Sequence, residues 1–342
     1  MKTSPAVFWL GLFAILLFSC RADKSSAQEE LIIQGQAQGT TYTVKYLGER
    51  IEELPARLDS LLEQIDHSLS TYDTSSLITD LNRGDTVLYE QKLWEMIELS
   101  HTLSEETSGA FDPTIGPLIR AWGWDLSDAE PMDSVKVDSL LQLKGFKQLA
   151  INPKFSHWKV TGPYLNFNAI AQGYAVDLMA ELLEAHQIQR YYVELGGELK
   201  VKGKSASDQA WKIGIDRPLF KEEKRELIAI VELMDAAMAT SGNYRKYYEI
   251  DGKKYSHTID PMNGYPVQHN LLSATVISEH CYRADALATA FMVMGRIAAE
   301  EFLAGTSDLA YLIYAKEDGS YGDYISPGLQ KKLKVLAADS VN

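Results

Sequence analysis

KYSHTIDPMNG (residues 254–264) and ADALATA (residues 284–290) are the two segments around which the rest of the chain is organised. The proline and glycine of the first segment predict a strand end that runs into a turn, and His257 lies just before that turn. The small residues of the second segment predict the first turns of a helix, on which Asp285 and Thr289 share one face. A carboxylate and a hydroxyl on one face can bind a hard cation, and a histidine beside them suggests chemistry on a phosphate. The same spacing also fits a plain turn followed by a core helix, so both interpretations stay open at this point.

Length and composition indicate a globular protein. The 342 residues allow one large domain or two modest ones, and a hydrophobic fraction of 46% is ample for a core. The formal net charge of −14 argues against a nucleic-acid backbone as a partner. An acidic protein that handles a phosphate ligand must supply positive charge locally, and a bound metal ion is one way to do so.

The N-terminus has the features of a targeting segment. Lys2 precedes the apolar run 6–18, which is short for a membrane span and ends just before Cys20, as in a bacterial lipoprotein signal. We therefore expect residues 1–19 to be removed as a lipoprotein signal peptide, Cys20 to carry lipid, and residues 20–30 to form a flexible tether. The protein would then be a membrane-anchored lipoprotein of the cell envelope that faces the periplasm. The alternative is a plain signal peptide with a chance cysteine.

Hydrophobic periodicity predicts a mixture of helices and strands. Further helices are expected after Pro55, over 91–106, from Leu165 to His186 and around 297–303. Strands are expected as a pair over 31–46, then over 191–195, 198–202, 211–215, 227–233, 236–241 and 311–314, before a polar tail. The helices and strands do not alternate strictly, which favours α+β layers.

Two loops and one helix start carry candidate ligand contacts. Tyr72 lies in a polar loop, where it could stack on a planar ligand or be half-buried structure. The loop 110–117 contains two prolines, and its Phe111 and Asp112 are candidates for an apolar wall and a hydrogen-bond acceptor. The helix expected from Leu165 begins with amide and small side chains. Such a start can present free N–H groups to an anion, or it can pack tightly on a sheet.

In this order the motifs of the chain resemble those of the ApbE family, the FAD:protein FMN transferases. The resemblance is carried by GTTY (39–42), STY (70–72), FDPTIGP (111–117) with WG (122–123), IAQGYAVD (170–177), ELGGE (194–198), TSGNY (240–244), HTIDP (257–261) with Gly264, and ADALATA (284–290). It covers about residues 33–333. It implies one domain over 31–335 with an ApbE-like layered fold, in which helices flank mixed, largely antiparallel sheets.

The resemblance implies a protein-modifying reaction. Such an enzyme binds FAD and Mg²⁺, and a Ser or Thr hydroxyl of an acceptor protein attacks the phosphorus on the FMN side of the pyrophosphate. AMP leaves, and FMN remains on the acceptor through a phosphoester bond. The implied acceptor is a protein with an exposed Ser/Thr flavinylation motif, such as a subunit of a membrane redox complex. No nucleic acid takes part.

The resemblance also assigns roles to residues of this chain. Asp285, Thr289 and the backbone carbonyl of Ala169 would hold the metal ion, and Asp285 would act in catalysis through it. His257 would be the general base, with Asp260 either orienting it or holding the turn. The residues expected to contact FAD are Gln38, Tyr72, Ala110, Phe111, Asp112, Asn166, Gln172 and Ile259.

Three positions depart from the usual pattern of the family. Gln38 replaces a methionine, residues 166–169 read Asn-Phe-Asn-Ala in place of Asp-Leu-Gly-Gly, and Gln172 replaces a lysine. The changes at Asn166 and Gln172 remove an acid and a base together, as though an amide pair stood in for an ion pair at the nucleotide. Two alternatives to the transferase therefore stay open: a Mg²⁺-dependent FAD pyrophosphatase that releases FMN and AMP, and a non-catalytic exported lipoprotein that binds FAD.

Overall fold

A computed structural model describes residues 29–124, 130–146, 157–158, 164–219, 226–243, 247–250, 253–256 and 258–336. The predictions for the signal peptide, Cys20 and His257 lie outside these residues. Among the helices that are described, none is long and apolar enough to cross a membrane.

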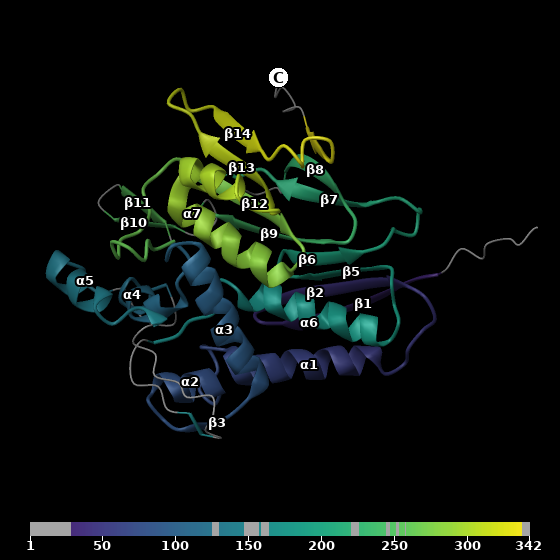
Figure 1. Cartoon of the computed structure of the whole chain (residues 1–342), viewed down its shortest axis with the longest axis horizontal. Coiled ribbons are helices and arrows are strands. Elements are labelled where there is room, and N and C mark those ends of the chain that lie inside the picture. The colour runs from purple at the N-terminus through teal and green to yellow at the C-terminus, as the bar shows by residue number, and fades with distance from the viewer. Residues whose placement is uncertain are drawn as a thin grey trace, which may run out of the picture.

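Eight antiparallel strands form the main sheet, in the order β1-β2-β5-β6-β9-β12-β13-β14 (Figure 1). The strands are β1 (Glu30–Ala37), β2 (Thr40–Leu47), β5 (Tyr191–Leu195), β6 (Glu198–Lys202), β9 (Ala236–Gly242), β12 (Leu271–Ser278), β13 (Leu309–Ala315) and β14 (Tyr321–Ile325). Largely antiparallel strands beside helices confirm the predicted α+β class.

A two-residue turn joins β1 to β2. Ala37 pairs with Thr40, so only Gln38 and Gly39 lie between the strands. Both have positive φ, at 50° and 72°, which suits the twist of a tight hairpin. The turn therefore fixes Gln38 at one end of the main sheet.

Three long helices, α1 (Leu54–Leu69), α6 (Ala171–Ala185) and α7 (Cys281–Leu303), cover one face of the main sheet (Figure 1). Apolar side chains at helical spacing drive this packing: Leu58, Leu62 and Ile65 of α1 are fully or almost fully buried. A further helix, α3 (Gln91–Glu106), packs its Leu93 and Met96 into the same core as α1 and α6.

A small sheet, in the order β15-β8-β7, covers part of the opposite face. It consists of β7 (Trp211–Asp216), β8 (Leu227–Leu233) and β15 (Leu333–Val335). Its Trp211 and Val231 share a core with Leu199 and Tyr311 of the main sheet. The central strand β12 is consequently buried at every position.

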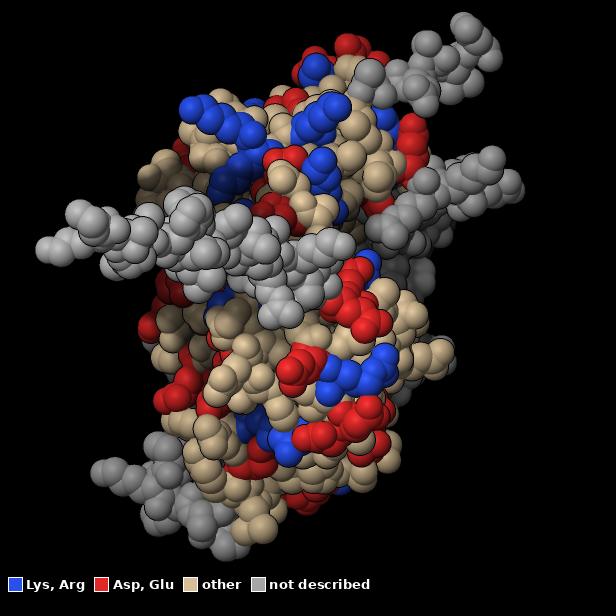
Figure 2. Space-filling view, turned by 90° about the vertical axis from the view of Figure 1, so that its right-hand side faces the viewer, with Lys and Arg blue, Asp and Glu red and all other residues tan. Residues whose placement is uncertain are grey.

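Short elements complete the described structure. They are α2 (Leu77–Asn82), β3 (Val87–Leu88), the 3-10 turn η1 (Pro113–Ile115), α4 (Gly116–Ala121), α5 (Ser134–Leu141), β4 (His157–Trp158), β10 (Tyr247–Ile250) and β11 (Lys253–Ser256). On the face shown in Figure 2, charges of both signs are present and acidic side chains run down the lower half, as befits a chain with a formal net charge of −14.

One local prediction was wrong, and two others need additions. The helix expected from Leu165 begins only at Ala171, because the Asn82 side chain hydrogen bonds both the N–H and the carbonyl of Leu165 at 2.8 Å and holds that backbone in a loop. The helix expected around 297–303 is present: it is the end of α7, which is interrupted at Gly295 (φ 75°, ψ 173°). The tail, expected to be polar, contains two strands that were not predicted, β14 and β15.

Candidate functional site

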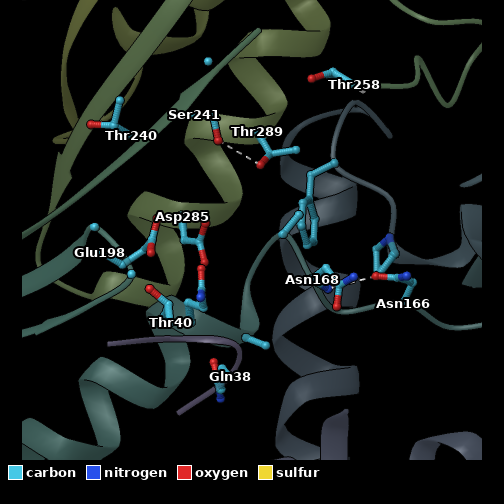
Figure 3. A pocket seen from close by; sticks show the side chains of 18 of the residues that line it. Gln38, Thr40, Asn166, Asn168, Glu198, Thr240, Ser241, Thr258, Asp285 and Thr289 are labelled. Carbon is cyan, nitrogen blue, oxygen red and sulfur yellow. Dashed lines mark hydrogen bonds between the residues drawn. The ribbon is translucent and has the colours of Figure 1, made fainter. Parts of the chain in front are cut away.

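A cavity of about 1130 Å³ opens at the end of the main sheet where the β1–β2 turn, the start of α6 and the first turns of α7 meet (Figure 3). Every residue predicted to hold the metal ion or to contact FAD lines it. These residues are Gln38, Tyr72, Ala110, Phe111, Asp112, Asn166, Ala169, Gln172, Ile259, Asp285 and Thr289. The fold thus brings together side chains that are about 250 residues apart in the sequence.

α7 contributes the two predicted metal ligands from one face. Asp285 is 7% exposed, and its Oδ2 accepts a hydrogen bond from the N–H of Gly173 near the start of α6, at 3.1 Å. One turn later, Thr289 Oγ1 lies 3.2 Å from Ser241 Oγ at the end of β9. Ala169 lines the same cavity from the loop before α6.

Close packing of α6 against α7 holds Asp285 in place. A Cβ atom on Gly173 would lie 2.5 Å from the Cys281 carbonyl oxygen and 2.8 Å from Asp285 Cβ. Only glycine allows the two helices to approach this closely here. The same approach lets the Gly173 N–H reach the carboxylate.

A second buried carboxylate faces Asp285, and sequence reasoning missed it. Glu198 at the start of β6 is 8% exposed and lines the cavity, and Figure 3 shows its carboxylate pointing toward that of Asp285. Burial raises the pKa of both carboxyl groups, and the charge of Asp285 raises that of Glu198 further. The segment ELGGE was part of the family resemblance, but its sequence does not indicate which of its two glutamates is buried.

The residues at this end of the cavity fit a hard divalent cation. They present two carboxylates and the Thr289 hydroxyl, all oxygen ligands of the kind that Mg²⁺ prefers. In the part of the chain that the structure describes, the buried Glu198 Oε2 has no hydrogen-bond partner. In the described ranges no cluster of three or more His, Cys, Asp and Glu side chains is placed to hold a metal ion. A metal here would therefore also depend on hydroxyl, carbonyl or phosphate oxygens.

Amide side chains line another part of the cavity and connect it to Tyr72. Asn166 is 4% exposed, and its Oδ1 accepts from the Asn168 N–H at 2.9 Å. Asn168 Nδ2 in turn donates to the Tyr72 hydroxyl at 3.0 Å. Tyr72 is half exposed, so this hydrogen bond orients an aromatic ring that could otherwise rotate freely.

Asn166 and Gln172, the amide pair expected at the nucleotide, both line the cavity, but within the described structure they are not hydrogen bonded to each other. Asn166 is bonded within its own loop, while the Gln172 amide lies against Gly196. Gln38 lies close to Asp66 of α1, where its amide partly opposes the rise in the pKa of Asp66 that burial causes. The three departures from the family pattern therefore occupy three separate places around one cavity.

The loop at residues 110–115 is held by its own hydrogen bonds. Asp112 Oδ1 accepts from the N–H of Thr114 at 2.9 Å and from its hydroxyl at 2.6 Å. Burial raises the pKa of Asp112, and the two bonds from Thr114 oppose that rise. Thr107 Oγ1 accepts from the Phe111 N–H at 3.1 Å, which fixes the buried Phe111 ring beside the cavity. Asp112 thus has a structural role in addition to any contact with a ligand.

The turn after residue 258 is stabilised by Asp260. Its carboxylate accepts from the Met262 N–H at 2.8 Å and from Asn263 Nδ2 at 2.5 Å. Of the two roles open for Asp260, holding the turn is therefore the one that these contacts support. The neighbouring Ile259 is buried and lines the cavity.

Comparison with known proteins places the chain beside flavin transferases. The model of the ApbE family matches residues 38–313. The FAD:protein FMN transferase of Vibrio cholerae is 32% identical over 329 residues, which are 93% of this chain and 96% of that protein. The FAD:protein FMN transferase of Escherichia coli K12 is 30% identical over 337 residues, or 93% and 95% of the two chains.

The similar solved structures are also flavin transferases. The flavin transferase ApbE from Vibrio cholerae superposes with a TM-score of 0.78 at 30% identity, and the match covers 89% of this chain and 99% of that one. The apo form of the flavinyl transferase ApbE from Pseudomonas stutzeri gives a TM-score of 0.79 at 33% identity, with 89% and 97% covered.

Proposed function

This chain belongs to the ApbE family, and from that premise we propose that it transfers FMN from FAD to a Ser or Thr hydroxyl of an acceptor protein. The observation that carries the proposal is the single cavity in which the oxygen ligands of α7, the amides of the loop before α6 and the Tyr72 and Phe111 rings meet. Each of these groups suits one part of a flavin dinucleotide.

The size of the cavity supports a large ligand. Its volume of about 1130 Å³ exceeds the range of roughly 300–1,000 Å³ that is usual for small-molecule sites. Phe111 supplies a buried apolar surface, and Tyr72, held by Asn168, supplies a ring on which a planar flavin or adenine can stack. The amides of Asn166 and Gln172 can donate to or accept from the polar edges of the nucleotide.

The pyrophosphate would lie near Asp285 and Thr289. These side chains, with the Ala169 carbonyl, would hold Mg²⁺, which supplies charge neutralisation at the phosphates and stabilises the leaving AMP. Gly173 donates its N–H to Asp285 and so keeps the carboxylate in a fixed position. A fixed ligand loses little freedom when the site is filled.

Transfer exchanges the phosphoanhydride bond of the pyrophosphate for a phosphoester bond to the acceptor. The acceptor oxygen forms a bond to the phosphorus on the FMN side, the bond from that phosphorus to the bridging oxygen breaks, and AMP leaves with the electron pair. The proton of the acceptor hydroxyl goes to a general base. His257 is our candidate, because an unperturbed imidazole with a pKa of about 6.5 is largely neutral at physiological pH.

We further propose that the protein acts in the cell envelope, anchored through lipid on Cys20, on a subunit of a membrane redox complex. The support is the apolar run that ends just before Cys20. Mass spectrometry of the protein purified from membranes tests this proposal. An N-terminal diacylated Cys20 is expected, and an unmodified Cys20 on the mature chain would contradict it.

The proposed reaction is tested by measuring AMP release by the full chain with FAD and Mg²⁺, with and without an acceptor that carries a flavinylation motif. Release that depends on the acceptor, together with a fluorescent acceptor band in a gel, supports transfer. Equal release without the acceptor would point to a pyrophosphatase instead. Tight FAD binding without AMP release in either sample would exclude both enzymes.

A further inference from the structure

Glu198 is a buried carboxylate that is not among the predicted metal ligands. It follows Gly196 and Gly197, whose φ values of 68° and 120° are open mainly to glycine and make a tight turn between β5 and β6. The turn places the Glu198 side chain inside the cavity, beside Asp285 on α7 (Figure 3).

The Glu198 carboxylate is not neutralised by the basic residue nearest to it on its own strand. Lys200 points to the same side of β6, but its Nζ donates to Asp177 Oδ1 at 2.6 Å. Glu198 Oε2 is shielded from solvent and has no hydrogen-bond partner among the described residues. A buried acceptor without a donor is rare in folded proteins and often marks the place of an ion or a water molecule.

Two acidic side chains that face each other out of solvent repel when both are ionised. A divalent cation between them removes the repulsion and gives the unpaired oxygen a partner. We infer that Glu198 is a further residue that holds the divalent cation, acting with Asp285 and Thr289 from the turn between β5 and β6. This inference rests on the proposed function, since the cation is the one that FMN transfer requires.

Metal affinity in the absence of FAD tests the inference directly. Binding of Mn²⁺ to the purified full chain in detergent can be followed by the loss of the free-ion electron paramagnetic resonance signal. Glu198→Gln keeps the size of the side chain and removes its charge. We expect it to weaken Mn²⁺ binding about 10- to 100-fold, the usual effect of removing a group that supports a metal.

Glu194→Gln is the matched control. Glu194 lies in the same ELGGE segment, is less buried, and accepts from the Gly197 N–H at 2.9 Å, a bond that a glutamine oxygen can still accept. Glu194 lines the same cavity, but its carboxylate is only partly buried and already has a hydrogen-bond donor, so this variant should weaken Mn²⁺ binding by no more than about fivefold. An equal loss of Mn²⁺ affinity in both variants would overturn the inference. It would mean that the overall negative charge of the cavity, and not Glu198 itself, attracts the ion.

Unchanged Mn²⁺ affinity in Glu198→Gln would also overturn it and would indicate that the two carboxyl groups share a proton instead. Thermal unfolding of the metal-free protein checks the fold, and Glu198→Gln should be at least as stable as the wild type because it removes an unpaired buried charge. If Glu198→Gln fails to fold, Glu198→Asp takes its place: it keeps the charge but withdraws the carboxylate by one methylene, and unchanged Mn²⁺ affinity in that variant would equally overturn the inference.

The test is separate from the test of the reaction. Wild-type FMN transfer with unchanged Mn²⁺ binding in the Glu198 variants would refute the role of Glu198 and leave the transferase intact. Loss of Mn²⁺ binding in those variants, in a protein that never transfers FMN, would establish the cation site and refute the transferase.

Discussion

At the scale of single residues, Asp285 is the side chain on which the proposed chemistry depends most. We expect Asp285→Ala to lower Mg²⁺-dependent turnover by about 100-fold or more, since a metal at a phosphate contributes several kcal/mol to the barrier and each 1.36 kcal/mol is about tenfold. Steady-state rates of AMP release measure the effect, and circular dichroism checks the fold. Asp318→Ala, on the exposed turn before β14, is the control and should keep full activity. Full activity in Asp285→Ala would show that the metal assignment is wrong.

Individual residues also show how far the sequence determines a site. Asp285 and Thr289 could be paired from their helical spacing alone, because residues four apart share a face wherever the helix lies. Glu198 could not be found in this way. Glu194 and Glu198 flank the same two glycines, and only the path of the turn decides that Glu198 is the one enclosed. Burial of a lone carboxylate is a property of the tertiary structure.

At the scale of elements, the crossing of α6 and α7 is the packing contact that positions the site. We expect Gly173→Ala to destabilise the protein by about 1–3 kcal/mol, the usual cost of overpacking, because the added methyl group would overlap the Cys281 carbonyl. It should weaken Mn²⁺ binding as well, since α7 carries Asp285. Chemical denaturation measures the first effect and Mn²⁺ titration the second.

Gly48→Ala is the matched control for that variant. Its nearest neighbour would be a Tyr46 ring carbon at 4.0 Å, so we expect a change in unfolding free energy within about 0.5 kcal/mol. Equal stability of Gly173→Ala and wild type would contradict the close helix crossing described above.

The elements that the sequence predicted best are those with strong periodicity. The helix expected over 91–106 and the strands expected over 191–195 and 198–202 have those bounds in the structure. Buried residues recur every three or four positions in the helix, and burial largely alternates along the strands. The strand β14 was missed because it lies at the edge of the sheet and only Gly322 in it is buried. The late start of α6 was missed because its cause, the Asn82 side chain, lies far away in the sequence.

At the scale of the whole molecule, FAD and Mg²⁺ should stabilise the fold together. A ligand that binds only the native state at 100 times its Kd adds about 2.7 kcal/mol to the free energy of unfolding. Because the cation and the pyrophosphate are expected to share one cavity, we predict that FAD with Mg²⁺ raises the unfolding temperature by more than the sum of the two separate increases. Calorimetry measures this. Purely additive increases would mean that the two ligands bind independently.

The most direct test of the central claim is the intact mass of an acceptor protein after incubation with the full chain, FAD and Mg²⁺. The proposed reaction predicts that the acceptor gains the mass of one FMN phosphoester and that AMP appears in equal amount. Both changes should disappear when EDTA removes the metal or when the acceptor Ser/Thr is replaced by alanine. An unmodified acceptor in the complete mixture, with FAD demonstrably bound to the enzyme, would contradict the claim.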